Sequence, residues 1–214
     1  MSDVPRITYL GQSGFYIETP DIKLLIDPMN QNSGALDGDI VYCTHNHVDH
    51  VGGVKTFLER NKDAILIGNE QVVEKFSQFD SRVKLVSDED TFDFKSLSFT
   101  FTKLKHGVFR GVYNLAVEVR LREFAFAHCG DAVSFEGFPS SSVDILAIPI
   151  SGTFAAGPKK ALNMIKKLSE PLPTIVPMHW LMRSPKSFCK KLRESKPEIT
   201  CIIPSNGEPL KGYE

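Results

Sequence analysis

Residues 44–53, THNHVDHVGG, hold an unusual concentration of side chains that bind metals. Three imidazoles and one carboxylate, from His45, His47, His50 and Asp49, fall within six residues. Burying these groups without a partner is costly, and imidazole together with carboxylate suits Zn, Fe, Mn and similar divalent ions. The alternative, a solvated polar loop, fits less well beside a strand and a pair of glycines. The stretch therefore predicts a metal site.

The elements on either side of this stretch can aim its side chains at one point. A predicted strand, 39–43, precedes it and a short predicted helix, 54–60, follows it. His45 and His47 share a face if the backbone between them is extended. Asp49 and His50 come where the chain turns into the helix, and Gly52-Gly53 lets backbones approach closely. We expect an ordered strand-to-helix loop of the kind that positions functional groups.

Three further candidate ligands also follow predicted strands. His106 comes after the strand at 96–102, Asp131 after the strand at 123–128 and His179 after the strand at 174–178. Taken singly, each is more commonly a core or surface residue than a ligand. Because strand ends can converge on one rim of a sandwich, we expect all three to join the His45 cluster.

The hydrophobic pattern alternates between strands and helices along the whole chain. The predicted strands are 7–10, 14–18, 22–26, 39–43, 64–67, 96–102, 113–120, 123–128, 143–150, 174–178 and 199–203, and the predicted helices are 54–60, 70–79, 158–168 and 187–194. Strands in both halves with helices between them favour two face-to-face sheets covered by helices, an α/β sandwich. No linker or repeat is apparent, so residues 1–214 are predicted to form a single domain.

Composition excludes some functions. The chain has 214 residues, 42% hydrophobic and 24% charged, which is ordinary for a globular protein able to bury a core without disulfides or a structural metal. A metal here would therefore serve chemistry. The formal net charge of -1 gives no sign of the basic surface typical of nucleic-acid binding.

The four cysteines, Cys43, Cys129, Cys189 and Cys201, show no CxxC spacing and are interpreted as free thiols in a reducing compartment. No signal peptide is recognised, and no apolar run approaches the roughly 20 residues of a membrane span. We expect a soluble cytoplasmic protein that does not enter a membrane. A homo-oligomer is left open.

The run HNHVDH resembles the HxHxDH signature of the metallo-β-lactamase fold, which is highly specific. Further motifs of that family have counterparts in family order over nearly the whole chain: Asp27 in LLIDP, His106, Gly130-Asp131, and His179 in VPMHW. The opening GQSGFYIETPDIKLLIDP and the PMHW ending are most similar to a small branch of metal-dependent hydrolases. That branch includes L-ascorbate-6-phosphate lactonase-like proteins, which are usually longer than this chain.

The resemblance implies a four-layer αββα sandwich and two divalent metal ions, zinc ahead of manganese or iron. It implies a first metal position with His45, His47 and His106, and a second with Asp49, His50 and His179. Asp131 would bridge the two ions, and Asp27 would orient a ligand or the loop. Ala132 departs from the Thr or Ser common in the family. Flavo-diiron oxygen reductases tend to have a glutamate at the position of His47, the second histidine of the signature. They also carry a flavin domain, for which this chain has no room.

Such a site predicts hydrolysis by a metal-activated water, with Asp49 and Asp131 as the catalytic carboxylates. Two divalent ions would keep about one net positive charge after Asp49, Asp131 and a hydroxide neutralise the rest. We therefore expect a small, anionic substrate such as a lactone, ester, thioester or phosphodiester. The alternatives are a nuclease or phosphodiesterase, which would need a basic channel, and a non-hydrolytic diiron or metal-binding protein.

Several other residues lie where they could line the site, but packing or surface roles are the favoured interpretation for each. They are Cys43, Cys129, His128, the segment 151–154, Trp180, Arg183 and Arg110.

Overall fold

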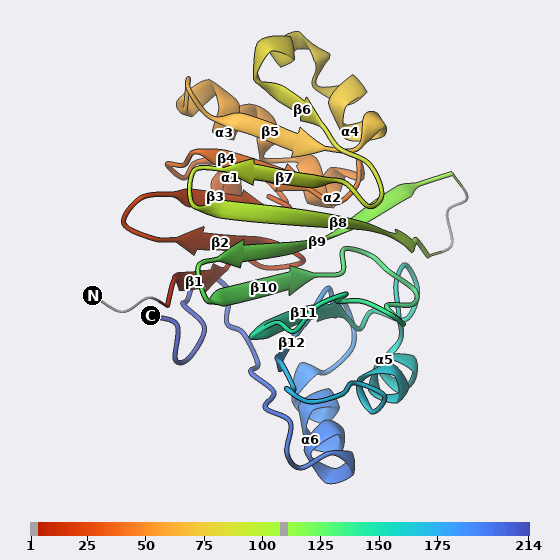
Figure 1. Cartoon of the computed structure of the whole chain (residues 1–214). Helices are drawn as coiled ribbons and strands as arrows, with labels where there is room; N and C mark the ends of the chain where they lie inside the picture. Colours follow the sequence, from red (N-terminus) through yellow and green to blue (C-terminus); the bar gives the residue numbers. More distant parts are fainter. Residues whose placement is uncertain (1–3, 108–110) are drawn as a thin grey trace.

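The computed structural model describes residues 4–107 and 111–214, and the strands within these ranges form two mixed six-stranded sheets (Figure 1). The first sheet follows chain order: β1 (Arg6–Tyr9), β2 (Phe15–Glu18), β3 (Lys23–Ile26), β4 (Ile40–Cys43), β5 (Ile65–Gly68) and β6 (Val83–Leu85). The second sheet runs in reverse order: β12 (Thr174–Met178), β11 (Ile145–Pro149), β10 (Phe124–His128), β9 (Tyr113–Leu121), β8 (Leu97–Lys105) and β7 (Thr91–Phe94).

Helices cover the outer face of each sheet, which gives the four layers αββα (Figure 1). The first sheet is covered by α1 (Gln31–Gly34), α2 (Val48–Val51), α3 (Val54–Arg60), α4 (Glu70–Lys75) and the 3₁₀ helix η1 (Ser77–Arg82). The second is covered by α5 (Pro158–Ile165) and α6 (Pro185–Ser195). This confirms the predicted sandwich. None of the described helices has the length and apolar character needed to cross a lipid bilayer.

Alternation along the strands explains why the central strands of each sheet are buried on both faces, whereas alternate residues over most of β8 are partly or fully exposed. In β3, Leu24 and Ile26 belong to the apolar cluster between the sheets, whereas Leu25 belongs to the cluster under the helices. Successive side chains of a strand point to opposite faces, so an unbroken apolar run fills two cores at once. The run predicted at 143–150 contains β11, whose five residues are all buried.

Strand direction brings several strand ends to one rim of the sandwich. In the first sheet β3 and β4 are parallel, and in the second sheet β10, β11 and β12 are parallel. The carboxyl ends of parallel strands meet at the same edge. The loops that follow β3, β4, β10 and β12 therefore lie close together, and β8 ends at the same rim.

Two sequence-based expectations about secondary structure are wrong. The segment 199–203 forms only an isolated bridge between Cys201 and Ile175, beside β12, and Pro204 cannot donate to a ladder. The α-helix expected over 70–79 ends at Lys75, and the separate 3₁₀ helix η1 follows it. The short strands β6 and β7 were not predicted, because their residues are mostly half-buried or exposed and give little hydrophobic signal.

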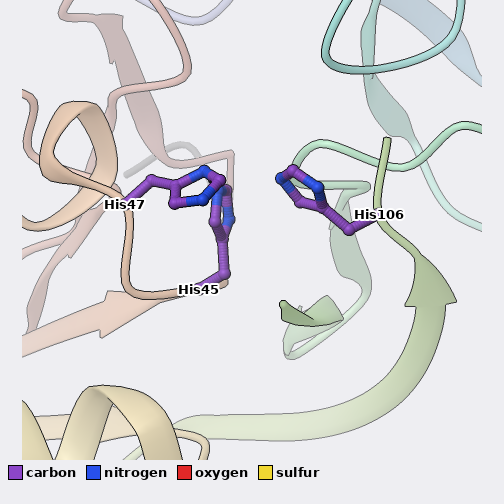
Figure 2. Close-up of side chains that lie close together, drawn as sticks. All are labelled: His45, His47 and His106. Atoms are coloured by element: carbon purple, nitrogen blue, oxygen red, sulfur yellow. The ribbon is translucent and has the colours of Figure 1, made fainter. Parts of the chain in front are cut away.

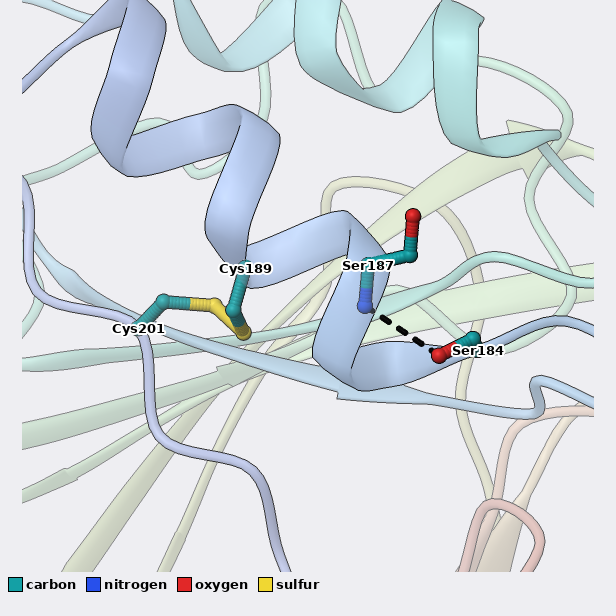
Figure 3. The surroundings of a disulfide bond; sticks show 4 residues. All are labelled: Ser184, Ser187, Cys189 and Cys201. Atoms are coloured by element: carbon teal, nitrogen blue, oxygen red, sulfur yellow. Dashed lines mark hydrogen bonds between the residues drawn. A yellow bond between two sulfur atoms is a disulfide. The ribbon is translucent and has the colours of Figure 1, made fainter.

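The expectation of four free thiols is also wrong. Cys189 on α6 and Cys201 form a disulfide, with their Cα atoms 5.6 Å apart (Figure 3). The Ser184 side chain accepts a hydrogen bond from the backbone N–H of Ser187 and begins α6, whose buried face then places Cys189 beside the returning chain. The pairing depends on this return, which spacing did not indicate. Cys43 and Cys129 are free and buried.

Candidate metal centre

The loop after β4 and the short helix α2 carry four of the seven predicted ligands. His45 follows β4 and is buried. His47 directly precedes α2, Asp49 lies in the first turn of this helix and His50 in its last. The close packing expected of the glycines is present, since a Cβ on Gly52 would lie 2.2 Å from the carbonyl oxygen of Met29. The loop is thus held tightly against the segment that follows β3.

One group of three imidazoles joins the two sheets (Figure 2). His45 and His47 come from the loop after β4, whereas His106 faces them from the end of β8. The Nε2 atom of His45 lies 3.1 Å from Nδ1 of His47. One ring nitrogen from each of the three lies within 4.8 Å of the others. This is the set predicted for the first metal position.

A second group combines Asp49, His50 and His179, again with one ligand atom each within 4.8 Å of the others. His179 directly follows β12 and reaches the site from the second sheet. Its Nε2 atom lies 3.4 Å from Oδ2 of Asp49, and Nε2 of His50 lies 3.9 Å from the same oxygen. This is the set predicted for the second position.

Asp131 lies between the two groups. Its carboxylate oxygens are 3.5 Å from Nε2 of His50, 3.2 Å from Nε2 of His179 and 3.9 Å from Nε2 of His106. The carboxylate therefore contacts members of both groups, which is the place expected of a bridging ligand.

The backbone before Asp131 is shaped by Gly130, which belongs to the Gly130-Asp131 motif, and by Asn114, which sequence analysis did not identify. Gly130 has a φ of +57°, and a Cβ on it would lie 2.1 Å from Oδ1 of Asn114. That oxygen accepts the backbone N–H of Asp131 at 3.0 Å, and the Asn114 amide donates to the carbonyl of Cys129 at 3.1 Å. Asn114 on β9 thus fixes the turn that presents Asp131.

Asp27 contacts both the ring of His50 and the residue before His45. Its buried carboxylate accepts hydrogen bonds from the backbone N–H and the hydroxyl of Thr44, each at 2.8 Å. It also lies 2.7 Å from Nδ1 of His50. A carboxylate on one ring nitrogen leaves the other free to bind a metal, and it fixes the orientation of the ring.

Replacing Asp27 by alanine is expected to destabilise the metal-free protein by about 3–5 kcal/mol, because a buried partner of His50 and of Thr44 is lost. Chemical denaturation of the metal-free protein would measure this change. Asp37→Ala is the matched control, since the Asp37–Arg60 pair is exposed and should contribute about 1 kcal/mol or less. Equal destabilisation by the two substitutions would contradict the assigned role of Asp27.

The two groups differ in their proton affinity. Burial lowers the pKa of His45 well below its ordinary value, and it lowers the pKa of His106 to about 4 against the pull of Asp131. Burial acts in the same direction on His179, but hydrogen bonds to Asp131 and Asp49 outweigh it and raise its pKa to about 9. For His50, burial is outweighed by Asp27 and Asp131, so its pKa is also raised.

The pKa values of Asp49 and Asp131 shift in the opposite direction from those of His50 and His179. Burial by itself raises the pKa of Asp49 and of Asp131, but contacts with His179 and His50 outweigh it and hold both values well below normal. In the metal-free protein the imidazoles of His45 and His106 therefore bind protons less readily than an ordinary histidine, and those of His50 and His179 bind them more readily.

The donor set fits a divalent metal. Nε2 of His50 and Oδ1 of Asp131 are buried and have no hydrogen-bond partner among the described residues. Buried polar atoms are nearly always satisfied, so two unsatisfied ligand atoms on neighbouring side chains fit a site that binds an ion. Imidazole nitrogen and carboxylate oxygen suit zinc, manganese or iron.

The weaker candidates have mainly structural contacts. Nε2 of His128 lies 2.9 Å from the carbonyl of Ser13, and Nδ1 of His128 accepts the backbone N–H of Gly130. The Arg183 side chain donates to the carbonyl of Ser151, and Trp180 packs against Tyr9. The thiol of Cys43 contacts the carbonyl of His50, and Cys129 lies in the outer core. Arg110 lies outside the described residues.

Gln12 is a site residue that sequence analysis missed. Its side-chain nitrogen donates to Oδ2 of Asp49 and lies 2.9 Å from Nε2 of His179. In the sequence this residue was noted only within the opening GQSGFYIETPDIKLLIDP, with no role assigned to it. The available signal was its position, because Gln12 follows β1 as other site residues follow their strands.

The chain is similar to proteins that are named as metal-dependent hydrolases. A protein of Thermococcus kodakarensis named as a metal-dependent hydrolase is 26% identical over 230 residues, which cover 96% of this chain and 99% of the relative. The solved structure of Igni18, described as a metallo hydrolase from Ignicoccus hospitalis, matches with a TM-score of 0.83 at 21% identity, covering 96% of this chain and 97% of the other.

A third match shows how widely the fold is used. CmlA, described as a diiron β-hydroxylase from Streptomyces venezuelae, matches with a TM-score of 0.71 at 13% identity. The match covers 94% of this chain and 53% of CmlA. Identity at this level shows the fold alone. Finally, the family model for the β-lactamase superfamily domain matches residues 6–179. This protein therefore belongs to the β-lactamase superfamily and has the metallo-β-lactamase fold.

Proposed function

We propose that the protein is a hydrolase that uses two divalent metal ions. The observation that carries the proposal is Asp131, whose carboxylate contacts both the His106 side of the site and the His50–His179 side. The names of its relatives support metal-dependent hydrolysis. Zinc is the favoured metal, with manganese and iron as alternatives.

In this proposal the first ion is held by His45, His47 and His106, and the second by Asp49, His50 and His179, with Asp131 shared. When bound, such a pair of ions supplies hydroxide at neutral pH and stabilises the negative charge that develops on the substrate.

Asp49 is the carboxylate best placed to receive a proton during the reaction. Its side chain is 35% exposed, whereas that of Asp131 is 2% exposed, so Asp49 lies nearer to an entering substrate and to solvent. Asp131 and the buried imidazoles would hold the ions in place. Asp27 and Asn114 fix two of these groups through hydrogen bonds and do not touch the substrate.

The proposed substrate is a small anion that contains a lactone, ester, thioester or phosphodiester bond. The net positive charge expected at a two-metal site with two bound carboxylates favours such a ligand. The L-ascorbate-6-phosphate lactonase-like branch belongs to this proposal as its most specific form. A small-molecule partner and a cytoplasmic location remain predictions. The disulfide removes the argument from free thiols for a reducing compartment.

A second candidate is diiron oxygen chemistry without hydrolysis, because the fold is shared with a protein described as a diiron β-hydroxylase. The imidazole-rich first group allows zinc as well as iron, so the element present in the purified protein separates the two.

Elemental analysis of the purified protein is the test. We expect about two metal ions per chain, as a two-metal clamp requires, and about one in each of the variants His47→Ala and His179→Ala. A screen of lactones, thioesters and phosphodiesters, run with the metal found, should then give turnover that a chelator abolishes. A protein that contains no metal and takes up neither zinc nor manganese would contradict the proposal. Iron with oxygen consumption and no hydrolysis would favour the second candidate.

A further inference from the structure

The turn between β1 and β2 places Gln12 at the rim where the predicted metal ligands gather. Gly11 and Gln12 have φ values of +85° and +52°, and the backbone N–H of Gly14 closes the turn on the carbonyl of Gly11 at 2.8 Å. A positive φ is uncommon for a residue other than glycine and is often found at functional sites. The contacts of Gln12 account for this conformation.

The backbone of Gln12 holds His179. Its carbonyl oxygen accepts the backbone N–H of His179 at 2.7 Å and the hydroxyl of Tyr9 at 2.9 Å. His179 itself has a φ of +45°, so this hydrogen bond helps to fix an uncommon conformation directly after β12. The next residue, Ser13, is tied through its carbonyl to the buried ring of His128. The turn is thus anchored to the second sheet at several points.

The side chain of Gln12 completes the arrangement. Its amide nitrogen donates a hydrogen bond to Oδ2 of Asp49 at 2.9 Å, and that oxygen lies 3.4 Å from Nε2 of His179. Neighbouring ligands of one ion with bonds near 2.1 Å are separated by about 3.0 Å in an octahedral shell and about 3.4 Å in a tetrahedral one. The Asp49–His179 separation already matches that of two ligands on one ion.

Asp49 is one of the two predicted ligands that are only half-buried, the other being His47. The side chain of Asp49 is 35% exposed in the first turn of a four-residue helix, where a carboxylate can turn toward water. The amide of Gln12 donates to Oδ2 of Asp49 without adding charge, so it fixes the carboxylate without competing electrostatically with a cation. Residues that fix ligands in this way commonly change metal affinity by about 10–100-fold.

We infer that Gln12 is a positioning residue that sets the metal affinity of the position formed by Asp49, His50 and His179. The inference rests on the two-metal site proposed above and concerns one of its two positions. It predicts a selective effect, because the contacts of Gln12 described above are made to Asp49 and His179 and not to His45.

Two substitutions distinguish the effect of the Gln12 side-chain amide from the effect of its backbone conformation. Gln12→Met keeps the length of the side chain and removes the amide. Gln12→Asn keeps an amide on a residue that tolerates positive φ, but it is too short to reach Asp49. Gln78→Met is the matched control, because it makes the same chemical change at an exposed position of η1.

The zinc affinity of each metal position is measured separately, by titrating chelator-buffered Zn²⁺ into a variant in which the other metal position has lost a ligand. The His47→Ala background reports the second position, and the His179→Ala background reports the first. We expect Gln12→Met and Gln12→Asn to weaken zinc binding about 10–100-fold in the His47→Ala background and by less than about threefold in the His179→Ala background. Gln78→Met should change neither affinity.

Unchanged zinc affinity of the second position in both Gln12 variants would overturn the inference. An equal loss at both positions would overturn it as well, because it would indicate general damage to the fold. Near-normal zinc binding by the first position shows that a variant is folded. If the unsubstituted protein binds two zinc ions and the Gln12 variants match it, only this inference fails. If the unsubstituted protein binds none, the proposed function itself fails.

Discussion

Turnover of an Asp131→Asn variant is expected to fall by about 1000-fold or more, and its metal content to fall below that of either single-position variant. Asp131 contacts His50, His106 and His179, so its charge serves both groups of ligands. Metal ions contribute several kcal/mol of transition-state stabilisation, and about 4 kcal/mol corresponds to a factor of about 1000 in rate. Asparagine has nearly the same shape and keeps the backbone N–H that donates to Asn114.

Metal content by elemental analysis gives a result before any substrate is known, and turnover follows once the screen has supplied one. Asp63→Asn is the matched control, because it removes one carboxylate charge at an exposed position. An Asp131→Asn protein that retains two metal ions and at least a tenth of normal turnover would show that Asp131 does not bridge.

Zinc affinity at the second position is expected to fall about 1000-fold between pH 9 and pH 6, while affinity at the first position changes little. Hydrogen bonds to Asp131 and Asp49, which outweigh burial, raise the pKa of His179 to about 9. Below that pH the ring carries a proton that a metal must displace. Each displaced proton costs about tenfold in affinity per pH unit. His50, whose pKa is also raised, makes the dependence steeper where it too is protonated.

The first position should behave differently, because burial lowers the pKa of His45 and of His47 below the ordinary value and that of His106 to about 4. No proton has to leave these rings at neutral pH. The His47→Ala and His179→Ala variants again report one position each, titrated with chelator-buffered Zn²⁺ at several pH values. Equal pH slopes for the two positions would contradict the difference in proton affinity described above.

The types and order of the candidate ligands were readable from the sequence. HNHVDH places four metal-binding groups in six residues, and His106, Asp131 and His179 were identified because each follows a strand. The strands themselves were visible because alternating or continuous apolar residues have few other uses. Local patterns of this kind do not depend on distant parts of the chain.

Residues that support the ligands were not readable in this way. Asn114 and Gln12 belong to residue types that are common in strands and turns, and neither has a local signature. Asn114 acquires its role because β9 lies beside β10 and brings its amide to the backbone of Asp131. Gln12 acquires its role because the turn after β1 meets His179 from the other sheet.

The wrong expectations have the same origin. The segment 199–203 has the composition of a strand, but it pairs with β12 at only one bridge. Cys189 and Cys201 gave no signal in their spacing, and they meet because α6 packs back against the second sheet.

The sequence by itself determined which side chains could bind metal, that they follow strands, and that strands and helices form an α/β sandwich. Only the tertiary structure decided that Asp131 lies between two groups of ligands, that Asp27 faces one ring nitrogen of His50, and that Gln12 holds Asp49 and His179. The physical reason is how far apart along the chain the interacting residues lie. Strand formation and turn formation depend on neighbouring residues, whereas a 3 Å hydrogen bond between two sheets depends on how their side chains pack.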